Sequence, residues 1–597
     1  MEHECCARRI DIESGFDSFD GTRLFYRAWL PATARADGNL RAFVFLHRGH
    51  EHSGRIQPLI SEFVEEGEWA FAWDARGHGY SPGARGDAPD FCTLVRDFNA
   101  FIHHLIAKYG IAMENFFIVA NSVGAIIAAT WLHDYAPRVR GAVMAAAAFD
   151  INLYIPFAKP ALRLATRFKP DLCVTSYIRS SMLTHSQEQA AAYDNDPLIT
   201  KNISARVLLD LADTAQRIVN DAAAIDVPIL MLVADRDYVV KRKPQWDFFE
   251  RLSSPLKRYV VLEGCHHAVF YEQDTTLAFQ ASGEFIEACY AQQPPEPRHY
   301  HDYDSNSASA SRYAALIDRR GIGWAARIFY GIQRGMLRVL GPLSNGMRIG
   351  LANGFDSGAS LDYVYTNRAN GSFGIGKFID RNYLDAIGWR GVRLRKVHLQ
   401  KALSDLIARQ PTDRPMRILD IAAGAGRYVL ETVKRFQDRN IEVTLRDHDE
   451  GNLEQARRLA TQLKLSARVT YQRRDAFDPA SYLDDEEAYD IVIISGLYEL
   501  FADNALVLQS LQGVGRKLRA WGHLIYTGQP WHPQLDLIAC TLNDHRQGMW
   551  TMRPRPQCEL DALVASAGCR KISTEIGLAG IFTVSVAQKI AAHGESD

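Results

Sequence analysis

The sequence lacks several features that mark special classes of protein. It has no Cys-x-x-Cys pair, and its nine cysteines form an odd number. This pattern argues against a disulfide framework and against a zinc site, and it favours free thiols in a reducing compartment. The longest apolar stretches, such as Gly141–Phe149, are far shorter than the ~20 residues that a membrane-spanning helix needs. The first residues contain no apolar core of signal-peptide length. We therefore expect a cytoplasmic protein without a transmembrane segment.

An excess of one charge is also missing. The 597 residues include 68 Lys+Arg and 70 Asp+Glu, which gives a formal net charge of −2. A strongly cationic nucleic-acid-binding protein is therefore not expected. Hydrophobic residues make up 47% of the chain, which excludes general disorder. The length exceeds the roughly 100–200 residues of one domain and predicts more than one core.

One segment differs in composition from the rest of the chain. Residues 292–311 are rich in Pro, Ser, Asp and His and hold almost no aliphatic side chains, so they cannot bury much surface. On both sides of this segment, short apolar runs alternate with longer stretches of helical character, which is the pattern of α/β folds. The sequence therefore predicts two α/β domains joined by a linker over residues 292–312.

The first domain contains a candidate nucleophile between a strand and a helix. The buried-strand run Phe116–Ala120 leads into Ser122, with Gly124 two residues later and a helical stretch behind it. A serine at such a tight turn, with small neighbours, fits a nucleophile elbow, although glycine is usual at the position of Ala120. The alternative is an ordinary serine in a strand–helix loop.

Two further motifs follow buried strands upstream of Ser122. The run HRGHEHSGR occupies residues 47–55, and DARGHGYSPG occupies residues 74–83. Together with the elbow, they resemble the monoacylglycerol lipase and lysophospholipase branch of the α/β-hydrolase fold. The resemblance implies a hydrolase domain over residues 1–291, with a cap at about 150–226. It also implies a serine ester hydrolase that acts on a lipid-ester or lysophospholipid-like substrate.

The resemblance assigns two partners to Ser122. A hydrolase of this fold needs an acid and then a histidine after the serine in chain order. The family spacing selects Asp237 as the acid, with Asp235 as its rival. It selects His267 as the base, with His266 as the rival. We expect His267 to take the serine proton and Asp237 to orient the imidazole ring.

The loop expected to form the oxyanion hole departs from the family pattern. The backbone N–H groups of Val123 and Gly49 are the implied donors to the oxyanion. Arg48 and His50 stand where the family has glycines, so a side chain would be strained wherever positive φ is required. Arg48 could instead point into the site and bind an anionic head group. The contrasting hypothesis is a catalytically inactive hydrolase-fold domain that binds a ligand and regulates the second domain.

The second domain contains a turn of small residues behind a strand. The run Arg417–Ile421 leads into a turn that contains Ala422, Gly424 and Gly426. Such a turn lets a ligand approach the backbone at a helix N-terminus. The next strand ends at Asp447, about twenty residues after the turn, where acceptors for ribose hydroxyls are found. These features indicate a nucleotide-like ligand.

Further polar residues, among them Asp475 and Ser495, stand at or just after the ends of the later strands of this domain. The set resembles class I S-adenosylmethionine-dependent methyltransferases, which have a Rossmann-like fold. The resemblance implies S-adenosyl-L-methionine as the cofactor, bound by Asp420, Ala422, Gly424, Gly426, Asp447, Asp475, Ala476 and Ser495. Ala422 stands where the first glycine is usual. A nicotinamide-binding domain is the alternative, but an antiparallel ending over residues 573–576 and 582–587 favours the methyltransferase.

The resemblance places the methyltransferase domain at residues 396–590, after a helical pre-region at 313–395. This pre-region could form a lid over the methyl donor, lie on lipid head groups or simply pack on the core. Tyr498 and Glu499 could orient or deprotonate the methyl acceptor, or only begin a helix. We expect a bifunctional enzyme with a lipid or other small ester as one substrate and an unknown methyl acceptor as the other. No metal is expected, and any membrane contact would be peripheral.

Overall fold

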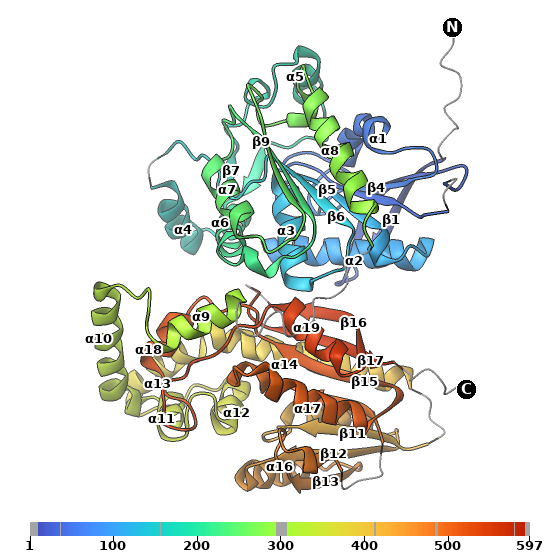
Figure 1. Cartoon of the computed structure of the whole chain (residues 1–597). Coiled ribbons are helices and arrows are strands. Elements are labelled where there is room, and N and C mark those ends of the chain that lie inside the picture. Colours follow the sequence, from blue (N-terminus) through green and yellow to red (C-terminus); the bar gives the residue numbers. More distant parts are fainter. Residues whose placement is uncertain are drawn as a thin grey trace. The chain divides into compact units, whose positions relative to one another are not determined.

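The computed structural model describes residues 10–35, 38–155, 157–293, 307–410, 414–483, 488–577 and 580–590. It divides into two compact units, residues 1–296 and 297–597, called here the N-terminal unit and the C-terminal unit (Figure 1). Much of the expected linker lies outside the described residues. Its last part, residues 308–312, is helical instead, because it opens helix α9 (Ala308–Ile317).

The N-terminal unit contains an eight-stranded sheet in the order β1-β2-β4-β3-β5-β6-β9-β10. The hairpin β1–β2 and the pair β2–β4 are antiparallel, and the later neighbours run parallel. Strands β3, β5 and β9 are buried at every residue, as expected for parallel strands covered on both faces. The strands are β1 Ile10–Asp17, β2 Arg23–Leu30, β3 Ala42–Leu46, β4 Trp69–Trp73, β5 Phe116–Asn121, β6 Gly141–Ala145, β9 Ile229–Ala234 and β10 Lys257–Leu262.

Two groups of helices cover this sheet. Helices α1 and α8 pack against each other, and α2, α3, α6 and α7 form the second group. The segment between β6 and β9, where the cap is expected, contains α4, α5, the short sheet β7–β8 and α6, and α6 packs on α4 as well as on α3. The bounds are α1 Gln57–Phe63, α2 Phe91–Tyr109, α3 Val123–Tyr135, α4 Ala158–Phe168, β7 Cys173–Thr175, α5 Gln187–Asp194, β8 Asn202–Ser204, α6 Ala205–Asn220, α7 Arg242–Arg251 and α8 Thr276–Tyr290.

The C-terminal unit contains a seven-stranded sheet in the order β13-β12-β11-β14-β15-β17-β16. Strand β17 is antiparallel to both β15 and β16, and the other neighbours are parallel. The expected Rossmann-like sheet with an antiparallel ending is therefore confirmed. The strands are β11 Met416–Ile421, β12 Ile441–Asp447, β13 Arg468–Arg473, β14 Tyr489–Ile494, β15 Leu518–Gly528, β16 Cys569–Ile576 and β17 Thr583–Lys589.

Helices cover this second sheet in two layers. Apolar side chains of α14, α15 and α16 form one core with the sheet, and those of α17 and α19 form another. The boundary expected at residue 395 falls inside α14, so the pre-region and the core share a helix. The helices are α9 Ala308–Ile317, α10 Trp324–Leu340, α11 Asn345–Asn353, α12 Gly358–Thr366, α13 Phe373–Leu384, α14 Ile387–Arg409, α15 Arg427–Val433, α16 Glu450–Leu463, α17 Asn504–Lys517, α18 Leu535–Thr541 and α19 Gln557–Ser566.

The pre-region packs on the C-terminal unit through a cluster of its own. Phe355, Val364 and Leu384 are buried together with Phe582, which stands just before β17. Amphipathic packing of α11–α13 on the core is thus observed, although α10 buries none of its residues. Within the described part of the chain, no helix combines the length and the apolar character needed to cross a membrane.

Candidate active sites

The N-terminal unit brings Ser122, His267 and Asp237 into one chain of hydrogen bonds. Ser122 Oγ donates to His267 Nε2 over 2.9 Å, and His267 Nδ1 donates to Asp237 Oδ2 over 2.9 Å. The side chains of His267 and Asp237 are each 3% exposed. A serine, a histidine and an acid at these distances have the geometry needed to activate a hydroxyl nucleophile.

Ser122 occupies a strained turn between β5 and α3. Its φ of 52° and ψ of −114° lie outside the helical and extended regions. Its N–H donates to the carbonyl of Ala145 over 2.9 Å, which fixes the turn against β6. At Gly124, a Cβ atom would lie 2.6 Å from the carbonyl oxygen of His47, so this position requires glycine. The sequence-predicted elbow therefore has the small neighbours and the strained backbone that the motif demands.

The acid of this site is held ionised by its surroundings. Asp237 Oδ1 accepts hydrogen bonds from the backbone N–H groups of Val239 and Val240 at 2.8 and 2.9 Å. Although burial acts to raise it, His267 and these two N–H groups hold the pKa of Asp237 below its ordinary value. Asp237 is therefore a carboxylate at neutral pH and can stabilise a positive charge on His267.

The two rival residues lie outside the hydrogen-bonded chain. The side chain of Asp235 is 40% exposed and lies 3.5 Å from Arg242. The ring of His266 lies against that of His185, with ring centroids 3.7 Å apart and planes tilted by 33°. The structure thus brings Asp237 and His267 to Ser122 and leaves Asp235 and His266 aside.

The loop after β3 has the unusual backbone that its sequence suggested. His50 has a φ of 71°, so positive φ occurs at one of the two positions where the related family has glycine. Gly49 lies against Val123, since a Cβ at position 49 would be 3.1 Å from Val123 Cγ2. The residues of both expected oxyanion donors are therefore neighbours.

Arg48 does not behave as a free cation at this site. Its Nε and Nη2 atoms donate to the carboxylate of Glu51 over 3.0 and 2.6 Å, and its guanidinium lies 4.9 Å from the ring centre of Tyr271. These contacts engage two donors of Arg48 within the loop and lend no support to the hypothesis that it binds a head group. The buried ion pair stabilises the loop instead.

One group of side chains near His267 has the spacing of metal ligands. Among the described residues, His185, His266 and Glu272 each offer a ligand atom within 4.8 Å of the others. The Glu272 carboxylate, however, accepts backbone N–H groups of His266 and His185 at 2.8 and 3.0 Å. Although burial acts to raise it, these N–H groups hold the pKa of Glu272 below its ordinary value. Glu272 thus ties the cap to the loop that carries His267.

The C-terminal unit contains a cavity of about 560 Å³ at the carboxyl ends of β11, β12 and β14, called here the glycine-turn cavity. The structure brings most of the residues predicted to bind the methyl donor to its wall. They are Ala422, Gly424, Gly426, Asp447, Asp475, Ala476 and Ser495. Ligands of open α/β sheets bind at this end of the strands.

The turn after β11 opens its backbone toward this cavity. Ala422, Gly424 and Gly426 have φ values of 55°, 57° and 59°. Nothing lies within 4 Å of a Cβ built at Gly424, whereas one built at Gly426 would meet Leu445 at 2.7 Å. Ala422 adopts the left-handed conformation despite its side chain, which costs roughly 1–2 kcal/mol relative to the usual glycine.

Asp447 connects the turn to the end of β12. Its Oδ2 accepts the N–H of Gly424 at 2.8 Å, and its Oδ1 accepts the N–H of Asp449 at 2.9 Å. Oδ1 also accepts Asn452 Nδ2 at 3.2 Å, so Oδ2 is the oxygen that keeps a lone pair for a ligand. Asp475 is exposed at the rim, where its Oδ1 accepts the N–H of Phe477 at 2.9 Å. Ser495 Oγ is buried and has no hydrogen-bond partner among the described residues.

Asp420 does not line the cavity, which corrects its expected role as a direct contact. It is fully buried behind Tyr428, whose hydroxyl donates to Asp420 Oδ1 over 2.6 Å. Burial raises the pKa of Asp420 to about 8, so its carboxyl group is neutral at pH 7. Tyr428 lines the cavity and was missed by sequence reasoning. Its place as the second residue of α15, directly after the glycine turn, is the signal that could have found it.

Part of the pre-region also lines the glycine-turn cavity, through Asp362 and Tyr365 of α12. The carboxylate of Asp362 accepts two hydrogen bonds from Arg427 at 2.5 and 3.0 Å, which fastens α12 to the start of α15. On the other side, the rings of Phe477 and Phe501 lie 4.3 Å apart. The pre-region therefore contributes side chains to the wall of the cavity.

Comparison with known proteins finds two family models that match successive parts of the chain. Residues 282–589, more than half of the chain, match a family model described as "Putative methyltransferase". The chain belongs to this family. Residues 39–274 match a second family model, described as "Serine aminopeptidase, S33". The two resemblances found in the sequence, to α/β-hydrolases and to methyltransferases, are therefore confirmed.

Individual relatives agree with this division. Protein YnbC of Escherichia coli (strain K12) is 42% identical over 97% of this chain and 98% of its own length. The "Phospholipase YtpA" of Bacillus subtilis (strain 168) is 25% identical over 43% of this chain and 98% of its own length. The "Monoacylglycerol lipase" of Mycolicibacterium smegmatis is 25% identical over 44% of this chain and 93% of its own length. Similarity to YnbC thus extends over both units.

Proposed function

We propose that this chain is a bifunctional enzyme. Its N-terminal unit hydrolyses lipid esters through Ser122, and its C-terminal unit transfers a methyl group from S-adenosyl-L-methionine. The observation that carries the hydrolase proposal is the uninterrupted hydrogen-bonded chain from Ser122 through His267 to Asp237. The methyltransferase proposal rests on the glycine-turn cavity and the polar residues gathered on its wall.

The hydrolase reaction follows from the positions of these atoms. His267 Nε2 takes the proton of Ser122 Oγ as this oxygen attacks the ester carbonyl carbon. His267 then returns the proton to the departing alcohol, and a water molecule releases the acid from Ser122 in a second, similar cycle. The carboxylate of Asp237 stabilises the imidazolium formed in between. N–H groups of Val123 and Gly49 hold the oxyanion, and loss of one such donor costs about 100- to 1000-fold in rate.

The preference for lipid esters rests on the cap. Among the exposed apolar side chains of the cap are Tyr154 at 63%, Phe157 at 84% and Phe168 at 84% exposure. Helix α4 buries none of its residues, so its apolar side remains available to an acyl chain. The phospholipase and the monoacylglycerol lipase found among the relatives support the same substrate class.

The residues of the glycine-turn cavity fit S-adenosyl-L-methionine. The open backbone at Gly424 leaves room for the ligand, and the buried Ser495 Oγ lacks a partner among the described residues. Asp447 would accept the ribose hydroxyls, and Asp475 with the N–H of Ala476 would hold the adenine edge. When bound, this cofactor supplies an electrophilic methyl group. The protein binds and orients it and keeps water from it.

A single labelling experiment tests the hydrolase proposal on the full chain. A fluorophosphonate probe reacts with a serine only where an adjacent base has activated it. We expect rapid labelling of the wild-type chain and none of Ser122→Ala. The exposed Ser61 offers a matched control, because Ser61→Ala should be labelled like the wild type. A wild-type chain that resists the probe would favour the alternative, a ligand-binding domain without turnover.

A further inference from the structure

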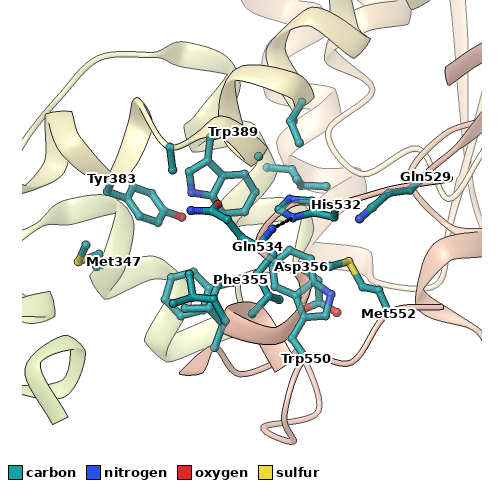
Figure 2. Close-up of a pocket in the computed structure, with 18 of the residues that line it drawn as sticks. Met347, Phe355, Asp356, Tyr383, Trp389, Gln529, His532, Gln534, Trp550 and Met552 are labelled. Atoms are coloured by element: carbon teal, nitrogen blue, oxygen red, sulfur yellow. Dashed lines mark hydrogen bonds between the residues drawn. The ribbon is translucent and has the colours of Figure 1, made fainter. Parts of the chain in front are cut away.

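A second cavity in the C-terminal unit, of about 400 Å³, has not been assigned a ligand so far. Its wall is largely aromatic and apolar, and it is called here the aromatic cavity. Figure 2 shows its side chains converging from both sides, among them Met347, Phe355, Tyr383, Trp389, Trp550 and Met552. The indoles of Trp389 and Trp550 are stacked, with centroids 6.2 Å apart. A wall of this kind suits a largely apolar ligand.

The aromatic cavity adjoins the glycine-turn cavity. Asp356, Leu361, Arg395, Gly496 and Leu500 line both of them. Gly496 follows Ser495 at the end of β14, so the two cavities meet at the edge of the sheet where the methyl donor is proposed to bind. A ligand in the aromatic cavity would therefore face a ligand in the glycine-turn cavity across this shared wall.

The aromatic cavity also contains buried polar atoms without partners. Glu499 Oε1 accepts a hydrogen bond from Arg395 over 3.0 Å, but Glu499 Oε2 has no partner among the described residues. The same holds for Gln529 Nε2 within the described part of the chain. These two residues are only 7% and 4% exposed. An unmade bond of a buried polar group is costly, so these atoms favour a ligand that supplies the missing partners.

His532 adds a hydrogen-bond donor to this wall. Its Nδ1 accepts the backbone N–H of Gln534 over 3.0 Å, as the dashed line in Figure 2 shows, so the ring proton resides on Nε2. Burial lowers the pKa of His532 to about 4, and the ring is neutral at pH 7. A Cβ at Gly388 would lie 2.8 Å from Nε2, so this glycine leaves the ring its place. His532 Nε2 can therefore donate a hydrogen bond to a ligand, and the ring does not take up a proton at pH 7.

We infer that the aromatic cavity binds the methyl acceptor, a mostly apolar molecule with a hydroxyl or amine group that donates to Glu499 Oε2. A second polar atom of this acceptor, one that accepts hydrogen bonds, faces Gln529 and His532. The inference rests on the proposed methyltransferase function, because it assigns a substrate class to that site. It also gives Glu499 a contact with the acceptor, whereas Tyr498 is buried in the core with its hydroxyl 3.1 Å from Ser510.

Equilibrium dialysis of the full chain with two matched probes tests this inference. The first probe, 4-octylphenol, carries the apolar body and a donor hydroxyl, and the second, 4-octylanisole, has a methyl ether in its place. We expect the phenol to bind about tenfold more tightly, since only it donates to the carboxylate. An arm with 4-octylaniline distinguishes an amine from a hydroxyl. Glu499→Gln should abolish the preference for the phenol, and Glu454→Gln, on the exposed surface of α16, should keep it.

A second variant guards against a folding defect in Glu499→Gln, which leaves Arg395 without its charged partner. Ala386 lines the cavity at the start of α14, so Ala386→Phe fills it and should block all three probes. Calorimetry with S-adenosylhomocysteine on the same variants separates the two proposals. If the wild-type chain binds S-adenosylhomocysteine but not the phenol, the assignment of the aromatic cavity is wrong and the methyl-donor assignment stands. If it binds the phenol but not S-adenosylhomocysteine, the methyl-donor assignment is wrong, although the aromatic cavity still binds an apolar ligand. Unchanged phenol affinity in both variants would also overturn the inference.

A different observation concerns the exposed surface of α10. Its apolar side chains recur every three or four residues, which places them on one side of the helix. Trp324 is 78% exposed, Ile328 is 56%, Ile332 is 58% and Val339 is 75%. The helix carries three arginines and no acidic residue. A helix with an exposed apolar side and cationic flanks is typical of segments that lie in the interface of a membrane.

This surface continues into the wall of the aromatic cavity. Helix α13 exposes Phe373 at 89% and Phe378 at 70%, and Phe378 also lines the cavity. Leu337 of α10 lines it as well. We propose that the apolar side of α10, together with these residues of α13, rests on a membrane surface that contains anionic lipids. An apolar acceptor could then pass from the membrane to the cavity without crossing water.

Vesicle sedimentation tests this second proposal. The full chain should bind vesicles of phosphatidylcholine mixed with phosphatidylglycerol more tightly than phosphatidylcholine alone, and salt should reduce the difference. The double variant Ile328→Glu/Ile332→Glu should bind about tenfold less, because apolar area is lost at the interface. Ile572→Glu, at an exposed apolar position of β16, is the matched control. Wild-type binding by the double variant would overturn the proposal. So would a dimeric wild type that the double variant converts to a monomer, because a second copy would then cover the surface.

Discussion

The two units differ in whether the buried polar atoms of their candidate sites have hydrogen-bond partners. In the N-terminal unit, Ser122, His267 and Asp237 already hold one another at 2.9 Å. In the C-terminal unit, Glu499 Oε2 and Gln529 Nε2 have no partners among the described residues, although both are buried. The triad side chains of the first candidate site are thus already bonded to one another, whereas the second candidate site keeps buried polar atoms that a bound ligand would satisfy. A hydrolase needs an activated nucleophile among its own residues, whereas a methyltransferase mainly needs a binding site that positions the methyl donor and the acceptor.

Two buried carboxyl groups show the same contrast in their electrostatics. Asp237 accepts three hydrogen bonds, one from His267 and two from backbone N–H groups, and its pKa lies below the ordinary value despite burial. Asp420 accepts one bond from Tyr428, and its Oδ2 has no partner among the described residues. Burial then raises the pKa of Asp420 to about 8. The number and charge of the donors therefore decide which carboxyl group is ionised.

The largest expected effect is that of Ser122→Ala on ester hydrolysis. Removal of the nucleophile should lower kcat for p-nitrophenyl butyrate by about 10⁶-fold, as expected for residues that act as a unit. The affinity of the C-terminal unit for S-adenosylhomocysteine should stay unchanged, which calorimetry on the same preparation would show. Substantial turnover by this variant would mean that the Ser122 assignment is wrong.

The next effect concerns the choice between two acids. Asp237→Asn should lower kcat by about 10⁴-fold, since the imidazole loses its orienting carboxylate. Asp235→Asn should have little effect, because the side chain is 40% exposed and lies near Arg242. Steady-state kinetics of the two variants with the same ester decides between them. A larger loss of kcat in Asp235→Asn would show that Asp235, and not Asp237, is the acid of this site.

These two predictions concern residues that the sequence alone could select. The elbow pattern pointed to Ser122, and the family spacing implied by the resemblance selected Asp237 over Asp235 and His267 over His266. Strand positions could also be predicted closely, because fully buried parallel strands appear as continuous apolar runs. The runs predicted at Phe116–Ala120 and Arg417–Ile421 agree within one residue with the bounds of β5 and β11.

The aromatic cavity could not be predicted in this way. Its wall combines residues from α10, α11, α13 and α14 with others near β15 and β17, and no local motif links them. The position of Asp420 behind Tyr428 also depends on packing in three dimensions. The same is true of α6, which lies within the expected cap and packs on both the cap helix α4 and the body helix α3.

The third effect is on the affinity for the methyl donor. Asp447→Ala should weaken binding of S-adenosylhomocysteine by roughly 1.5–3 kcal/mol for each charge-assisted bond to a ribose hydroxyl. Asp475→Ala should weaken it less, because Asp475 is exposed at the rim and backbone donors remain. Calorimetry measures both. Since Asp447 also holds the N–H of Gly424, Asp447→Asn is the companion that keeps an acceptor at this position.

A control ligand sharpens this third prediction. NADH should bind weakly or not at all, because the antiparallel ending of the sheet is that of a methyltransferase and not of a dinucleotide-binding domain. Tight NADH binding, or an Asp447→Ala variant with wild-type affinity for S-adenosylhomocysteine, would remove the basis of the methyl-donor assignment.

The smallest effect is on the stability of the C-terminal unit as a function of pH. Asp420 has a pKa of about 8 in the folded chain, far above the ordinary value of 3.8. Between these pH values the folded state keeps a proton that the unfolded state has lost, so the free energy of unfolding falls as pH rises and levels off above about 8.

Asp420→Asn keeps the acceptor for Tyr428 but does not titrate. Its stability relative to the wild type should increase from pH 6 to pH 8 by on the order of 1–3 kcal/mol. Urea unfolding at several pH values measures this difference, with Asp405→Asn at an exposed position of α14 as the control. Equal pH dependence in Asp420→Asn and the wild type would show that Asp420 is ionised in the folded chain, and the contrast between the two buried carboxyl groups would then be lost.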